Sequence, residues 1–135
     1  MDEIEKLCHR YPALKSCEDS ICESSQLLVE TFRSGNKLLL CGNGGSAADA
    51  QHLATELMGG MSDHDRKPIP SISLATDSSF LTAWSNDTDF ESIFSRQVQG
   101  LGLPGDVLVG ISTSGNSENI VSAIKQAKFK ELKTI

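Results

Sequence analysis

The chain has 135 residues, of which 39% are hydrophobic and 22% are charged, and its formal net charge is −6. One compact globular domain fits this length and composition, while the acidic balance argues against a nucleic-acid partner, which would need clustered Lys and Arg. The apolar runs are far shorter than the roughly 20 residues of a membrane helix, and the acidic start is unlike a signal peptide, so we expect a cytoplasmic protein without a membrane partner.

Residues 1–34 are expected to form helices. Apolar residues recur in steps of three or four from Ile4 to Phe32, which is typical of amphipathic helix. Pro12 should divide this region into a short and a longer helix, and the longer one should end near Gly35. The four cysteines form no Cys-x-x-Cys pair, so buried thiols are favoured over disulfides or zinc ligands: they are Cys8, Cys17, Cys22 and Cys41.

From residue 35 onward, short apolar runs alternate with helical patterns. The runs predict strands at 37–42, 70–74, 105–112 and 132–135, and the helical patterns fall at 46–58, 78–84, 89–100 and 117–129. Because parallel strands need crossover connections, this alternation predicts an α/β fold with a doubly wound parallel sheet flanked by helices. The last strand has no loop after it, which indicates either an edge strand or a truncated chain.

Two loops at strand ends are candidate binding sites. Gly42-Asn43-Gly44-Gly45-Ser46 follows a buried strand and opens a helix that Ser46 is placed to cap. Backbone N–H groups and the helix dipole would converge there, which suits an anion. The loop matches neither a dinucleotide fingerprint nor a P-loop, and a plain tight turn is the alternative.

The second loop supplies hydroxyl groups at the same expected edge of the sheet, from Ser112, Thr113, Ser114 and Ser117. It contains no Lys or Arg, so backbone amides and hydroxyls would have to hold an anion. An N-capped loop rich in turn formers is the alternative when the loop is taken alone. Two such loops after two parallel strands favour a binding site.

His52 and Glu56 stand at an i, i+4 spacing, with Asp49 three residues before His52. Residues at these spacings share one side of a helix. The pair would suit two ligands of a divalent metal ion, or a carboxylate base steadied by an imidazole. An exposed polar face explains the same spacing. Asn86-Asp87 likewise has two interpretations, a polar loop at the site or an ordinary turn.

Together, residues 41–52, Glu56, Asn86-Asp87 and residues 110–117 resemble the phosphoheptose isomerases. These sugar isomerase (SIS) domain proteins convert sedoheptulose 7-phosphate to D-glycero-D-manno-heptose 7-phosphate, on the route through ADP-heptose to bacterial lipopolysaccharide. The resemblance covers residues 1–135 as a single SIS domain, with N-terminal helices over 1–34 and the sugar-phosphate-binding part over 35–135. It also implies a homotetramer.

The resemblance assigns roles to the candidate residues. Ser112, Thr113, Ser114 and Ser117 resemble the phosphate cradle of the family. The other expected substrate contacts are Asn43, Gly44, Gly45, Ser46, Asn86 and Asp87. His52 and Glu56 are similar to two zinc ligands of the family, with Glu56 also the expected catalytic base.

The chain departs from the family pattern at its far end. Family members continue with further strands and a helix whose Gln and His complete the zinc site, so we expect a C-terminally truncated isomerase with two zinc ligands missing and little activity alone. The alternatives are a non-catalytic sugar-phosphate sensor and a protein-binding regulator similar to a replication-initiation factor. The His52–Glu56 pair favours the enzyme, because a binding module has no need of it.

Overall fold

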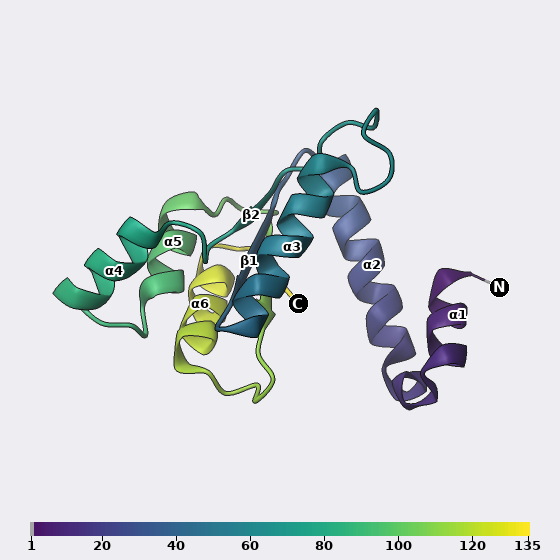
Figure 1. Cartoon of the computed structure of the whole chain (residues 1–135), viewed down its shortest axis with the longest axis horizontal. Coiled ribbons are helices and arrows are strands. Elements are labelled where there is room, and N and C mark those ends of the chain that lie inside the picture. The colour runs from purple at the N-terminus through teal and green to yellow at the C-terminus, as the bar shows by residue number, and fades with distance from the viewer. Residues whose placement is uncertain (1) are drawn as a thin grey trace.

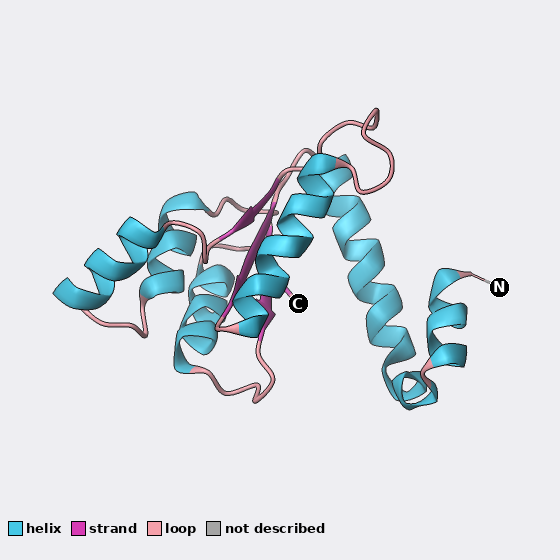
Figure 2. Cartoon of the chain, viewed as in Figure 1, coloured by secondary structure: helices cyan, strands magenta, loops and turns pink. Residues whose placement is uncertain are grey.

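A computed structural model describes residues 2–135 and shows a central parallel sheet with helices on both of its faces (Figures 1 and 2). In chain order the elements are α1 (Glu3–Arg10), the 3₁₀ helix η1 (Pro12–Cys17), α2 (Glu18–Arg33), β1 (Leu38–Gly42), α3 (Gly45–Gly59), β2 (Ser71–Ser73), α4 (Ser78–Asp87), α5 (Ile93–Leu101), β3 (Val107–Ile111), α6 (Glu118–Phe129) and β4 (Lys133–Thr134). The predicted doubly wound α/β sheet is confirmed.

The sheet has the strand order β2-β1-β3-β4, and every neighbouring pair is parallel. β1 is central: Leu38 is aligned with Ser71 of β2 on one side and with Val107 of β3 on the other. All five residues of β1 are buried. An uninterrupted apolar strand is what helices on both faces of a parallel sheet require.

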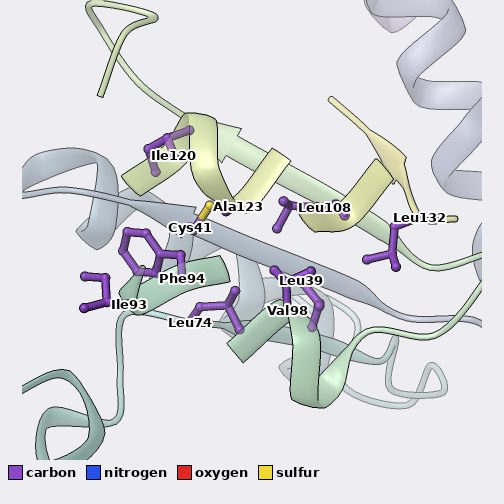
Figure 3. Packing of buried hydrophobic residues seen from close by; sticks show 11 residues of the cluster. Leu39, Cys41, Leu74, Ile93, Phe94, Val98, Leu108, Ile120, Ala123 and Leu132 are labelled. Atoms are coloured by element: carbon purple, nitrogen blue, oxygen red, sulfur yellow. The ribbon is translucent and has the colours of Figure 1, made fainter. Parts of the chain in front are cut away.

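Two apolar clusters fill the space between the sheet and its helices. Successive side chains of a strand point to opposite faces, so Leu39 and Cys41 belong to one cluster and Leu38 and Leu40 to the other. The first cluster packs against α5 and α6, where Phe94, Val98 and Ile120 approach the strands (Figure 3). The second packs against α3, with side chains of α2 at its border.

The N-terminal helices reach beyond the sheet. The second half of α2 packs on the sheet through Leu28 and Phe32, whereas α1 lies at the far side of α2 from the strands (Figure 1). The predicted break at Pro12 is confirmed. Among residues 2–135, no helix is both long enough and apolar enough to cross a membrane.

The cysteines match their predicted state only in part. All four are free thiols; Cys8 and Cys41 are buried, Cys22 is half-buried and Cys17 is exposed. The prediction of a buried thiol is therefore wrong for Cys17, which lies at the end of η1, away from either apolar cluster. Burial raises the pKa of the Cys41 thiol to about 12.

Two helices differ from their predicted bounds. α4 continues to Asp87, beyond the predicted end at residue 84, and closes where the Thr88 N–H donates to the Trp84 carbonyl oxygen at 2.9 Å. α5 begins at Ile93 rather than at residue 89. Asp89 instead forms a turn in which its Oδ1 accepts a hydrogen bond of 2.6 Å from the Ser92 N–H, and aspartate often stabilises such turns.

Candidate functional site

The two predicted loops leave the same edge of the sheet. β1 and β3 are parallel neighbours in which Cys41 is aligned with Gly110 and Gly42 with Ile111. The residues that follow these strands therefore emerge together, at the carboxyl ends where open α/β sheets build their sites. α3 begins directly after the first loop and α6 directly after the second.

The first loop turns sharply at Gly44, whose φ of 57° and ψ of −121° are rarely adopted by any residue except glycine. This turn starts α3 at Gly45, so the prediction that Ser46 caps the helix is wrong. Ser46 lies in the first turn, where its N–H donates to the Asn43 carbonyl oxygen at 3.0 Å. Within residues 2–135, the N–H groups of Gly44 and Gly45 have no hydrogen-bond partner.

The second loop gathers three hydroxyl groups. The Ser112 hydroxyl oxygen lies 3.1 Å from that of Ser117 and 3.4 Å from that of Ser114. The N–H of Gly115 donates to the Ser112 hydroxyl at 3.1 Å, and that of Asn116 to the Ser114 hydroxyl at 3.2 Å. Thr113 is exposed on the same loop. The loop therefore presents clustered hydroxyls rather than charged groups.

The first turn of α6 adds backbone donors beside these hydroxyls. Ser117 is the N-cap residue, and its carbonyl oxygen accepts hydrogen bonds from the N–H groups of Ile120 and Val121 at 3.0 Å each. In the described part of the chain, the N–H groups of Glu118 and Asn119 have no such partner. Unpaired N–H groups at a helix N-terminus, next to hydroxyls, form a site that suits a phosphate group.

Asn119 links the two loops and is not among the residues predicted from the sequence. The Asn43 side-chain amide donates to Asn119 Oδ1 at 2.8 Å, and the Asn119 amide donates back to Asn43 Oδ1 at 2.9 Å. Asn119 is 3% exposed. One sequence signal could have found it: Asn119, Ala123 and Ala127 recur at every fourth position on the buried side of α6, so a polar side chain interrupts an otherwise apolar stripe.

His52 and Glu56 form a pair on α3, with His52 Nε2 and Glu56 Oε1 3.3 Å apart. The side chains are 75% and 36% exposed. Together with Asp49 they border a hollow of about 720 Å³ whose remaining lining is almost entirely apolar. His52 lies about two helical turns past Gly45, roughly 10 Å along the axis, and no hydrogen bond joins the pair to the serine loop among residues 2–135.

The pair offers suitable but incomplete ligands for zinc. Imidazole nitrogen and carboxylate oxygen both bind zinc, which takes three or four protein ligands in most sites. Within residues 2–135, no group of three or more His, Cys, Asp or Glu side chains is placed to hold a metal ion. His52 and Glu56 therefore account for two ligands at most, and their role in metal binding stays a prediction.

Asn86 and Asp87 lie in the last turn of α4, not in a loop. Both are exposed, and the Asn86 amide donates to Asp87 Oδ1 at 2.9 Å. The end of α4 lies away from the start of α3 (Figure 1), so the structure does not bring these residues to the two loops. Phe90 and Glu91, which follow them, do reach the loops, because they line a hollow of about 460 Å³ with Asn43, Ser117 and Asn119.

Comparisons with known proteins agree on one family. A model of the SIS domain matches residues 1–135. The chain is 51% identical to the phosphoheptose isomerase of Maridesulfovibrio salexigens, over 94% of this chain and 65% of that relative. It is 49% identical to the phosphoheptose isomerase of Helicobacter pylori, over 97% of this chain and 69% of that relative.

A solved structure gives the same result. The phosphoheptose isomerase GmhA from Neisseria gonorrhoeae matches with a TM-score of 0.81 and 40% identity, over 97% of this chain and 65% of that chain. The chain thus spans about two thirds of the length of these relatives.

Proposed function

Because the chain belongs to the SIS-domain family, and within it to the phosphoheptose isomerases, we propose that it isomerises sedoheptulose 7-phosphate to D-glycero-D-manno-heptose 7-phosphate. One observation carries this proposal beyond the family: two loops rich in hydroxyls and unpaired N–H groups meet at one edge of the sheet. The relatives are named as enzymes, so the sensor and the protein-binding regulator are not favoured.

The serine loop is the proposed phosphate cradle. Ser112, Thr113, Ser114 and Ser117 offer hydroxyls, and the start of α6 offers N–H groups and the positive end of its dipole. A phosphate dianion would accept hydrogen bonds from all of these groups. The first loop, from Asn43 to Ser46, is the proposed contact to the sugar.

The reaction moves a proton between neighbouring carbons. A base takes a proton from C1 of the ketose, an ene-diol forms, and a proton returns at C2 to give the aldose. Glu56 is the proposed base, with its carboxylate steadied by His52 at 3.3 Å. N–H groups such as those of Gly44 and Gly45 are suited to stabilise the oxyanion that develops on the substrate.

Zinc is part of the proposal, with His52 and Glu56 as two of its ligands; a Glu56 carboxylate that holds the ion does not serve as the base at the same time. The bound ion would supply Lewis-acid polarisation of the substrate carbonyl group. We also propose a cytoplasmic homotetramer that serves heptose synthesis for lipopolysaccharide. Light scattering after size-exclusion chromatography, at several protein concentrations, would test the tetramer: a constant mass of four chains supports it, and a constant single-chain mass contradicts it.

The decisive experiment is turnover with a matched pair of variants. We expect the chain, incubated with sedoheptulose 7-phosphate and zinc, to produce an aldose slowly, which ¹H NMR detects by its C1 proton. Glu56→Gln should lower kcat by about 10²-fold or more, because removing a general base costs that much. Glu23→Gln, on the exposed side of α2, is the control and should keep full activity.

The outcomes separate the claims. Equal turnover by the Glu56→Gln variant and by the unmodified chain would show that Glu56 is not the catalytic base. Binding of the sugar phosphate with no aldose formed, by this chain and also by a chain extended to the full length of its relatives, would overturn the isomerase proposal and favour a sensor.

A further inference from the structure

The reciprocal hydrogen bonds between Asn43 and Asn119 connect two segments that are 76 residues apart in the chain. Asn43 stands between the end of β1 and the turn at Gly44, and Asn119 stands in the first turn of α6. Each amide donates once to the other and accepts once from it. This pair is thus a direct side-chain link between the loop that follows β1 and the helix that follows the serine loop.

Burying this polar pair costs free energy unless both hydrogen bonds form. Asn119 is 3% exposed, and a buried amide that loses its partner keeps the full cost of its desolvation. The neighbours of Asn119 on the same side of α6 are Ile120, Ala123 and Ala127, where an apolar side chain would pack at no such cost. A satisfied buried polar pair instead fixes one arrangement of the groups that it joins.

The arrangement that it fixes is the one a sugar phosphate would meet. The hollow of about 460 Å³ beside the pair is lined by both asparagines, by Ser117 and by Phe90, Glu91 and Glu118. An asparagine amide has two N–H donors and two acceptor lone pairs, so the pair leaves one of each on Asn43 for another partner. Asn119 therefore holds Asn43 in one orientation while part of its amide stays available.

We propose that Asn119 is a positioning residue, which acts through Asn43 to hold the first loop and the serine loop at the separation that a sugar phosphate requires. The inference deepens the proposed function and rests on it. Asn119 itself does not need to touch the substrate. Its loss should therefore raise KM for sedoheptulose 7-phosphate by about tenfold, the value of one hydrogen bond, and should change kcat less.

The sharpest test is Asn119→Asp, studied at two pH values. A carboxylate accepts a hydrogen bond from the Asn43 amide but cannot donate to Asn43 Oδ1, whereas a protonated carboxylic acid does both, as the native amide does. The ratio of variant KM to unmodified KM should thus be high at pH 7.5 and should fall towards one once the pH drops below the pKa of the new carboxyl, which is about 3.9 in an unperturbed aspartate. Taking the ratio removes the effect of pH on the phosphate and on Glu91 and Glu118, which the two proteins share.

Asn119→Leu separates positioning from charge. A carboxylate near the phosphate would also repel it, and acid would relieve this repulsion as well. Leucine breaks the pair without adding charge, so positioning predicts a raised KM at both pH values, whereas repulsion alone predicts a normal KM. Ser122→Ala, on α6 but outside the pair, is the control and should leave KM unchanged.

The pair also has a signature that does not depend on activity. In ¹H–¹⁵N NMR spectra, one of the two side-chain amide protons of Asn43 should exchange slowly with solvent in the unmodified chain and rapidly in Asn119→Leu. A protected amide proton without any binding of the sugar phosphate would contradict the proposed function alone. Turnover by the unmodified chain with an unchanged KM in Asn119→Leu would overturn the inference. Should Asn119→Leu fail to fold, the pH dependence of Asn119→Asp decides, and a ratio that does not fall with acid rejects the proposal.

Discussion

Gly42 has no side chain, and this allows the start of α3 to lie close to the end of β1. A Cβ at this position would lie 2.5 Å from the Ser46 carbonyl oxygen and 2.9 Å from the Ser46 Cβ. Both distances are shorter than real Cβ contacts, and the oxygen belongs to the backbone of α3. The helix start would have to move, so the approach of α3 to the end of β1 depends on glycine.

We therefore expect Gly42→Ala to lower the free energy of unfolding by about 1–3 kcal/mol, the usual cost of overpacking. Gly45→Ala is the matched control, because a Cβ there meets nothing within 4 Å and alanine favours a helix. Urea unfolding followed by circular dichroism measures both. Equal stability of Gly42→Ala and the unmodified chain would contradict this expectation and show that the start of α3 can shift at little cost in free energy.

Asp106 connects two elements of the sheet, the start of β3 and the start of β1. Its carboxylate is 1% exposed. It accepts hydrogen bonds from the Lys37 N–H at 3.0 Å, from the Leu103 N–H at 2.8 Å and from the Asn36 amide at 3.2 Å, and it pairs with the Lys37 ammonium group. Burial alone would raise the pKa of Asp106, but the hydrogen bonds from Lys37, Leu103 and Asn36 outweigh it and lower that pKa.

This depressed pKa predicts how stability depends on pH. In the unfolded chain Asp106 titrates near pH 3.9, so its stabilising contribution is complete above about that pH. It is lost as the pH falls through the lower folded-state pKa. Asp106→Asn should cost about 2–4 kcal/mol at pH 7, because it leaves Lys37 without its partner and turns an amide donor towards other donors.

Denaturant unfolding of both proteins at pH 7 and pH 3 measures this effect. The difference between them should shrink at the lower pH. A difference that stays constant with pH would mean that the charge on Asp106 contributes nothing. Glu131→Gln, on an exposed glutamate, is the control for general charge effects.

At the level of elements, the sequence predicted the helices and strands whose bounds depend on residues close together in the chain. β1 was predicted from its run of Leu38 to Cys41 between turn residues, and the break at Pro12 from the missing N–H of proline. The start of α5 was predicted wrongly because the turn at Asp89 depends on one side-chain hydrogen bond. The cap at Ser46 was predicted wrongly because a backbone turn at Gly44 starts the helix first.

The candidate site was predictable only as far as its parts follow strands. The two loops were found because parallel strands end at one edge. Asn119 was missed because its partner Asn43 is 76 positions away, a distance that no local pattern bridges. The spacing of His52 and Glu56 correctly predicted that the two side chains meet, but it could not tell which hollow they border.

At the scale of the whole molecule, the hollow beside His52 and Glu56 is a large apolar surface. It is lined by Leu28 of α2, Leu53 and Leu57 of α3 and Val109 of β3, among others. Leu53 is 48% exposed. Exposed apolar surface of this extent binds small apolar molecules.

We expect the fluorescent dye 8-anilinonaphthalene-1-sulfonate to bind in this hollow, and Leu53→Ser to weaken that binding severalfold with little change in stability. The physical reason is the loss of apolar contact area with the dye. Leu103→Ser is the matched control, because Leu103 is 59% exposed and lies outside the hollow. A dye titration measures the affinity of both variants. Equal dye affinity for the two would show that the dye binds outside the hollow.

The central position of β1 also shapes how the chain is made. Both strands that pair with β1 come later in the sequence, and Val107 of β3 follows Leu38 by about 70 residues. At a synthesis rate of about 5–20 residues per second, the ribosome needs roughly 4–14 seconds to add them. For that time the apolar residues 38–41 have no β3 to pair with, so we expect a chaperone to hold this segment on the nascent chain. Crosslinking of a chaperone to residues 38–41 should decline once β3 has emerged.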